Sequence, residues 1–154
     1  MPTFKGDKKK DTTYVTFEDF AHPELSFYNV LLKELDVQGT SSAGYVRKNW
    51  KLKFYDKIQH MVGAIKAKVY CIKVDYAEAT GTHNTGCANF VETLYSEPIP
   101  PQENNPLCRT TIYGKPILLF HQADENSDPV FYGKMSAVVK LSLIYGETPG
   151  MDNA

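Results

Sequence analysis

The residues best suited to chemistry are a Gly- and Ser-rich loop and two lysines on the strand predicted after it. In the loop, Gly39, Ser41 and Ser42 offer backbone N–H groups and hydroxyls that can cradle a phosphate. On the strand, Lys51 and Lys53 could neutralise the phosphate charge, as lysines do in kinases generally. The alternative is a β-turn with self-capping hydroxyls beside a solvated strand face, and the residues alone favour that alternative.

Phosphoryl transfer would also need carboxylates that hold Mg²⁺ and a residue that orients the nucleophile. Asp75 and Glu78 are the only acidic residues inside a motif of this chain. Neither lies in an Asp-x-x-x-x-Asn or Asp-Phe-Gly context. The residues therefore predict no catalytic site and no cofactor, and ATP with Mg²⁺ belongs to a kinase-like alternative.

A histidine at the predicted start of a helix is the other group that could act chemically. A helix N-terminus favours the neutral imidazole, so His83 could serve as a ligand or a base. The four histidines show no metal-ligand spacing such as His-x-x-x-His, and no Ser-His-Asp or Cys-His arrangement can be read from the sequence. We therefore expect no metal site, and a His83 that makes local hydrogen bonds.

Length and composition predict one ordinary globular domain. The chain has 154 residues, of which 42% are hydrophobic and 23% charged, enough to bury a substantial core. A net charge of -1 argues against a dedicated nucleic-acid binder. No apolar run is long enough for a membrane span, and the Lys-rich N-terminus is not followed by the apolar stretch of a secretory signal. The three cysteines form no CxxC pair, which is typical of reduced thiols.

Alternating apolar residues predict strands in the first half of the chain. The clearest is 50–54, where three large apolar residues alternate with the two lysines. A short strand is predicted at 14–17, and 27–38 fits either a helix or a strand, with the strand favoured at 35–38. Residues 62–76 are partly apolar on both faces, which is typical of a central strand.

The hydrophobic period changes in the second half. Cys87, Phe90, Val91 and Leu94 mark one face of a helix over about 83–96, with Thr82 as its N-cap. Four of the nine prolines then predict a surface loop at 97–106. The remaining elements are four short strands and two turns, predicted at 109–113, 116–121, 130–134 and 137–145 for the strands and at 113–116 and 124–128 for the turns.

These elements predict an α+β fold, a mostly antiparallel β-sheet that carries one main helix. Residues 1–12 are polar and Lys-rich, and we interpret them as a flexible basic arm. The alternative is an extension that docks on a neighbouring subunit or on nucleic acid. Residues 13–146 then form a single globular α+β domain, and 147–154 a frayed tail.

Two motifs are unusually specific, Gln38-Gly39-Thr40-Ser41-Ser42 and Gly81-Thr82-His83-Asn84-Thr85-Gly86. The first precedes an aromatic-Lys-aliphatic-Lys strand, and the second follows a strand that ends in an acidic, small-residue loop. Together with a weaker block, residues 109–117 followed by 130–134, they resemble the first half of a CotH kinase-like domain, as found in tailed-phage virion proteins. The resemblance favours Lys51 over Lys53 under a kinase-like function.

The resemblance ends after Lys134. In the CotH kinases, the metal-binding and catalytic acidic residues belong to the second half of the domain, which this sequence does not show. The resemblance therefore implies a fold more strongly than an activity. We expect a non-enzymatic phage protein that acts by protein–protein binding, as a structural component of the virion associated with the tail or capsid.

Its partners would be other phage or host proteins, within an oligomer or a larger assembly, in the virion or the host cytoplasm and without a membrane. The loop 39–47, the helix start 81–86 and the Pro-rich loop 97–106 are the expected binding surfaces. They contain the candidate partner-binding residues Tyr45, Arg47, Thr82, His83, Asn84, Pro100 and Pro101. Aromatic residues near the N-terminus either add to this surface or fill the core, namely Tyr14, Phe17, Phe20, Phe27 and Tyr28.

Two alternative functions stay open. The first is an ATP-binding CotH-like protein kinase or a nucleotide-binding remnant, in which Gly39, Ser41, Ser42, Lys51 and Lys53 would contact ATP. The second is a phage accessory inhibitor of a host defence protein. Nothing in the sequence separates this second alternative from a structural role.

Overall fold

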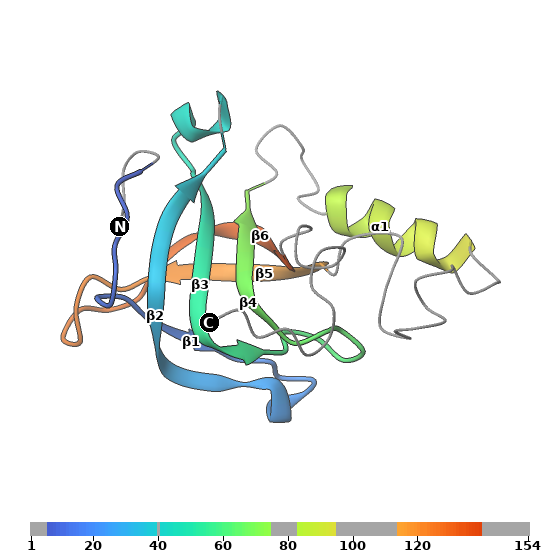
Figure 1. Cartoon of the computed structure of the whole chain (residues 1–154), viewed down its shortest axis with the longest axis horizontal. Helices are drawn as coiled ribbons and strands as arrows, with labels where there is room; N and C mark the ends of the chain where they lie inside the picture. Colours follow the sequence, from blue (N-terminus) through green and yellow to red (C-terminus); the bar gives the residue numbers. More distant parts are fainter. Residues whose placement is uncertain (1–5, 40, 75–82, 95–113, 140–154) are drawn as a thin grey trace.

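A six-stranded antiparallel sheet, curved into a half-barrel, forms most of the structure (Figure 1). The computed structural model describes residues 6–39, 41–74, 83–94 and 114–139. The strand order is β1-β2-β3-β4-β6-β5. The strands and the helix have the bounds β1 Tyr14–Phe17, β2 Phe27–Gln38, β3 Asn49–Ile58, β4 Ala67–Lys73, α1 His83–Leu94, β5 Gly114–His121 and β6 Val130–Val139. The predicted α+β class, mostly antiparallel sheet with one main helix, is confirmed.

The core lies on the inner face of the curved sheet. On β3, Trp50 and Phe54 are buried and Leu52 packs against them, as the alternation predicts. Burial of each large apolar side chain contributes about 1.5–3 kcal/mol, and a slip of one residue would turn the whole set outward. The buried cluster therefore sets the strand register, and it comprises Leu32, Leu35, Val37, Trp50, Phe54, Ala64, Ala67, Tyr70, Ile72, Val74, Met135 and Ala137.

The strand β4 is central, as its two apolar faces predict. It pairs with β3 on one side and with β6 on the other. Tyr70 and Ile72 belong to the inner core, and Cys71 is buried on the opposite face. Cys71 therefore packs as a small hydrophobic residue.

Residues 27–38, which fitted either a helix or a strand, form the long strand β2. Near its start, Asn29 has a φ of 50° and donates its backbone N–H to Thr16 Oγ1 at 3.1 Å. Asn is one of the few residues besides Gly that adopt this left-handed conformation readily. Asn29 thus lies beside the register shift in the pairing of β1 with β2.

Two predictions for the C-terminal strands are wrong. The turn expected at 113–116 does not include 114–116, because these residues pair with β6 as the first residues of β5. The strands expected at 130–134 and 137–145 are one strand over the described residues, because Met135 and Ser136 continue the pairing and are fully buried. The predicted strand at 109–113, the loop at 97–106 and the tail lie outside the described residues.

The helix α1 confirms the predicted helix over its described length, but its apolar stripe does not face the sheet. Thr85 and Ala88 are buried, whereas Phe90 and Leu94 are 64% and 65% exposed. A Cβ built on Gly114 would lie 2.6 Å from Thr85 Cγ2. The first turn of α1 therefore packs on the backbone of β5, and this contact leaves the stripe pointing elsewhere.

The described part of the predicted N-terminal arm, residues 6–12, lies along β2. The backbones of Lys9 and Leu35 exchange two hydrogen bonds of 2.9 and 2.8 Å. Gly6 N also donates to the buried carboxylate of Asp36 at 3.1 Å. These contacts give the arm a definite path, whereas its flexibility in solution stays a prediction.

Candidate interaction surface

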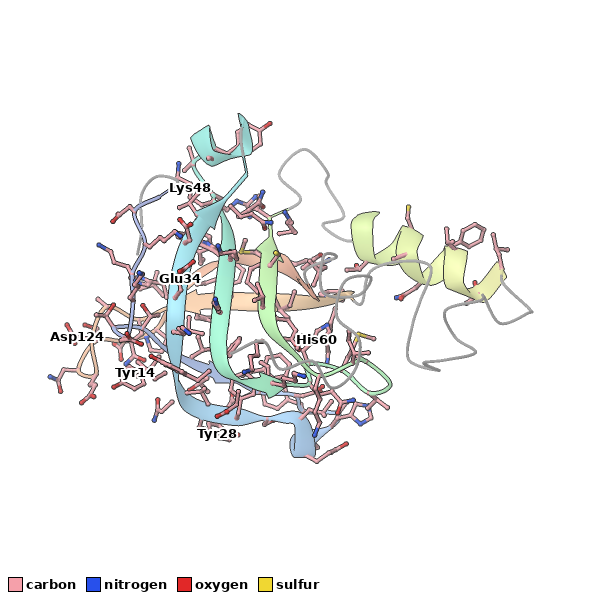
Figure 2. All side chains as sticks on the ribbon, in the orientation of Figure 1. Tyr14, Tyr28, Glu34, Lys48, His60 and Asp124 are labelled. Atoms are coloured by element: carbon pink, nitrogen blue, oxygen red, sulfur yellow. The ribbon has the colours of Figure 1, made fainter. Side chains whose placement is uncertain are left out.

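The loop between β2 and β3, predicted as a binding surface, is fixed to the sheet. It begins at Gly39, whose φ of 115° suits glycine, and continues through the 3-10 helix Ser41–Gly44. Lys48 ends it with two hydrogen bonds, from its Nζ to Ala43 O at 2.6 Å and from its backbone N–H to Tyr132 Oη at 2.9 Å. Figure 2 shows Lys48 at this end of the sheet. These two hydrogen bonds therefore attach the end of the loop to Ala43 and to β6.

Of the two candidates on this loop, Tyr45 is exposed and Arg47 is partly buried. The guanidinium of Arg47 lies over the backbone of β6, because a Cβ built on Gly133 would meet its Nη1 at 2.9 Å. Val46, between them, is exposed. The loop thus offers Tyr45 and Val46 to a partner, while Arg47 helps to hold the loop on β6.

The lysines that could neutralise a phosphate lie on the outer face of the sheet, next to a carboxylate. Lys51 Nζ lies 3.1 Å from Glu34 Oε1, and Lys8 Nζ lies 3.7 Å from the same oxygen. Burial by itself raises the pKa of Glu34, but the hydrogen bond from Lys51 and the nearby positive charges lower it below its ordinary value. Lys53 pairs with Glu34 in the β2–β3 register.

This arrangement directs Lys51 away from the Gly-Ser loop. Lys51 pairs with Asp36 in the register, and its ammonium reaches Glu34, which is further from Gly39 along β2. The ammonium of Lys51 is therefore engaged by Glu34, and a role of Lys51 in phosphate binding stays a prediction. The side chains of Ser41 and Ser42 lie outside the described part of the chain.

The remaining sequence candidates fall mostly outside the described residues. Thr82, Pro100 and Pro101 are among these, as are Asp75 and Glu78. His83 and Asn84 begin α1, but their side chains are not described. Their roles stay predictions.

The N-terminal aromatic residues divide between the core and the surface. Phe17 and Phe27 stack with ring centroids 5.5 Å apart, and Phe27 packs against the core. Tyr14, Phe20 and Tyr28 are exposed, and Figure 2 shows Tyr14 and Tyr28 on the side of the sheet that carries β1 and β2. A binding role for the exposed Tyr14, Phe20 and Tyr28 stays a prediction.

An exposed apolar patch on the β5–β6 hairpin was not predicted. It consists of Leu118, Phe120 and Phe131, which are 65%, 52% and 57% exposed and are called the hairpin patch below. Phe120 pairs with Phe131 across the two strands, with ring centroids 5.4 Å apart. Leu118 lies two residues before Phe120, on the same face of β5.

A sequence signal for this patch exists. Residues 117–120 are Ile-Leu-Leu-Phe, apolar on both faces, which is typical of a strand covered on both sides. In the structure Ile117 and Leu119 pack against the core, and the other half of the strand is exposed. Because the core covers only one face of this strand, the apolar residues on its other face form an exposed patch.

The turn beyond the hairpin patch is acidic. Asp124, Glu125 and Asp128 are all exposed, and Figure 2 shows Asp124 at the tip of the hairpin. The Asp124 carboxylate accepts hydrogen bonds from Ser127 Oγ at 2.8 Å and Asn126 N at 2.9 Å. The bond from Ser127, followed by that from Asn126, lowers the pKa of Asp124 and keeps the turn negatively charged.

In the described ranges, no three or more His, Cys, Asp and Glu side chains gather as they would around a metal ion. None of the helices described is both long and apolar enough to cross a bilayer. Comparison with known proteins finds no matching family model, no matching curated protein and no matching solved structure.

Proposed function

We propose that this chain acts by protein–protein binding rather than by catalysis, and the hairpin patch is the observation that carries the proposal. A contiguous exposed apolar patch on a folded domain is typical of a site at which another protein binds. Phe is also enriched in the cores of protein interfaces. Phe120 and Phe131 already touch in the free chain, so little side-chain entropy is lost when a partner covers them.

The lysine arrangement supports the same proposal. A phosphate-binding lysine must point its ammonium at the phosphate, but that of Lys51 contacts Glu34. The exposed Tyr45 and Val46 on the fixed loop offer a second contact area of the kind that interfaces use. The described surface residues therefore fit a protein-binding site better than they fit a nucleotide-binding site.

The resemblance to tailed-phage virion proteins suggests where this binding takes place. On that basis the chain is a structural component of a phage particle, associated with the tail or capsid. Its partners are other phage or host proteins, and it works in the virion or in the host cytoplasm.

The test is a capture experiment with matched variants. The immobilised chain is incubated with a lysate of phage-infected cells, and retained proteins are quantified by mass spectrometry. We expect the wild type and the control Val62→Ser, at an exposed apolar residue outside the candidate surfaces, to retain the same protein in near-stoichiometric amount. The double variant Phe120→Ser/Phe131→Ser should lose it while its circular dichroism spectrum is unchanged.

Two outcomes would overturn the proposal. One is a captured set that the double variant retains as well as the wild type does. The other is phosphate transfer from ATP that Lys51→Ala abolishes, which would establish the kinase alternative. Capture of a host defence protein instead of a virion protein would keep the binding function but replace the structural role with an inhibitory one.

A further inference from the structure

The strand β5 ends the sheet that the described residues form, and none of the described strands pairs with its other side. It follows β6 in the strand order, and no described strand lies beyond it. An edge strand presents a row of unpaired N–H and C=O groups that can template another strand. Pro116 lacks an N–H group, so it limits the usable edge to residues 117–121.

The side chains next to this edge are apolar on both faces. Leu118 and Phe120 are exposed on the outer face, and Ile117 and Leu119 are partly buried on the inner face. A strand added here would therefore have an apolar neighbour on each of its faces. Cross-strand apolar pairs of this kind each contribute roughly 0.2–1 kcal/mol.

The charge at the hairpin end of the edge has one sign. Residues 116–133 contain three carboxylates and no lysine or arginine. The three carboxylates are those of the exposed turn, at Asp124, Glu125 and Asp128. A segment on the β5 edge would meet this charge at one end, so complementarity requires basic residues there.

We infer that β5 takes up an extended segment of a partner protein as an additional strand, with alternating apolar side chains and basic residues at the end beside the turn 122–128. The inference rests on the proposed function and names the kind of partner. Main-chain hydrogen bonds supply affinity in such strand addition, and side-chain contacts supply specificity.

A second copy of this chain fits the edge less well. Pairing of β5 with the β5 of a copy, centred on Leu118, would place Lys115 beside the acidic turn. That ammonium is already bound to the Asp19 carboxylate on the inner face. Self-pairing would also leave unmet the hydrogen bond that Pro116 cannot donate.

The probe for this inference is a fluorescein-labelled peptide of alternating Val and Thr with lysines at one end. A second peptide has glutamines in place of the lysines, and a third has N-methylated residues at alternate positions. Binding to the full chain is followed by fluorescence anisotropy, and hydrogen exchange is measured for the amides of 117–121. The charge variant is Glu125→Gln/Asp128→Asn, which leaves the hydrogen-bonded Asp124 intact, and the control is Val62→Ser, at an exposed apolar residue between β3 and β4.

We expect saturable binding of the lysine peptide, slower exchange at 117–121 and no binding of the N-methylated peptide. The charge variant should bind the lysine peptide roughly two- to tenfold more weakly than the wild type does, and its affinity for the glutamine peptide should be unchanged. Binding without protection of 117–121, or no saturable binding by the wild type, overturns strand addition.

The capture experiment with Phe120→Ser/Phe131→Ser decides the proposed function separately. A concentration-dependent dimer that protects 117–121 would make a second copy the occupant and overturn the partner assignment.

Discussion

Lys115, near the start of β5, binds the carboxylate of Asp19, which follows β1, so that this salt bridge joins the two edge strands of the half-barrel. Asp19 is buried and also accepts the backbone N–H groups of Ala21 and His22, at 3.1 Å each. Lys115 Nζ lies 5.8 Å from the ring centroid of Phe17. Because β1 and β5 are not neighbours in the sheet, this link holds together elements that no shared ladder connects.

The link predicts a pH-dependent stability. The hydrogen bond from Lys115 is the main cause that lowers the pKa of Asp19, and burial opposes it. A carboxylate with a lowered folded-state pKa contributes stability above its ordinary pKa of about 3.9, and loses it as pH falls through the folded-state pKa. Asp19→Asn should therefore lower the melting temperature at neutral pH, and the gap to wild type should narrow below about pH 4.

Thermal unfolding followed by circular dichroism between neutral and strongly acidic pH measures this gap. The control is Asp56→Asn, which removes an exposed carboxylate on β3. It should leave the melting temperature close to that of wild type throughout. If the difference in melting temperature between wild type and Asp19→Asn does not change with pH, the ion pair is not the cause of that difference.

The close approach of α1 to β5 predicts a rescue. Gly114→Ala places a Cβ 2.6 Å from Thr85 Cγ2 and 3.1 Å from Val138 Cγ1, and overpacking of this kind costs about 1–3 kcal/mol. Thr85→Ser removes the methyl group and keeps the hydroxyl. The double variant should therefore recover part of the free energy of unfolding measured by urea denaturation.

The control for this prediction is Gly86→Ala, at the residue that follows Thr85 in α1. A Cβ there meets nothing within 4 Å, and an alanine in a helix is more favourable than glycine by roughly 0.5–1 kcal/mol. Gly86→Ala should thus stabilise the chain slightly. The double variant could instead have a lower free energy of unfolding than Gly114→Ala alone. In that case the contact of Thr85 with Gly114 is not the origin of the strain.

The hydrogen bond from Lys48 N to Tyr132 Oη predicts that the β2–β3 loop resists proteolysis. Tyr132→Phe leaves the backbone N–H of Lys48 without its acceptor, which costs about 0.5–1.5 kcal/mol. The ring stays against Trp50, whose centroid is 6.2 Å away. Trypsin should therefore cut after Arg47 and Lys48 faster in Tyr132→Phe than in wild type, while Tyr28→Phe cuts at the wild-type rate. Equal cleavage rates would mean that other contacts hold the loop.

The sequence predicts the strands best where one face is buried. The alternation of Trp50, Leu52 and Phe54 with two lysines specifies β3 and its inner face, because burial decides which residues point inward. It predicts less where pairing overrides local signals. Gly114 and Pro116 have the residue types of a turn, yet both belong to β5, because they pair with Val138 and Ser136 of β6.

The candidate surface was harder to predict than the fold. Helical periodicity found α1, but its contact with the sheet depends on Gly114, which is far from it in sequence. The hairpin patch likewise depends on which face of β5 and β6 is packed against the core, which no local pattern encodes. The covering of a sheet face is a long-range property, so the exposure of Leu118 and Phe120 follows from tertiary packing and not from their residue types.

The ion pair on the outer face gives the last prediction. The side chains of Lys51 and Glu34 are 25% and 14% exposed, so Lys51→Met should lower the free energy of unfolding by no more than about 1 kcal/mol. It should raise the pKa of Glu34, since the hydrogen bond from Lys51 is the largest of the contributions that lower this pKa. Stability from Glu34 is present above its ordinary pKa of about 4.3 and lost as pH falls below it, so the variant should depend less on pH in that range. Carbon-13 NMR of the Glu34 carboxyl measures the titration directly. Lys53→Met, which removes a positive charge that acts on Glu34 without a hydrogen bond, should raise this pKa less, and an equal rise in both variants would contradict the assigned role of Lys51.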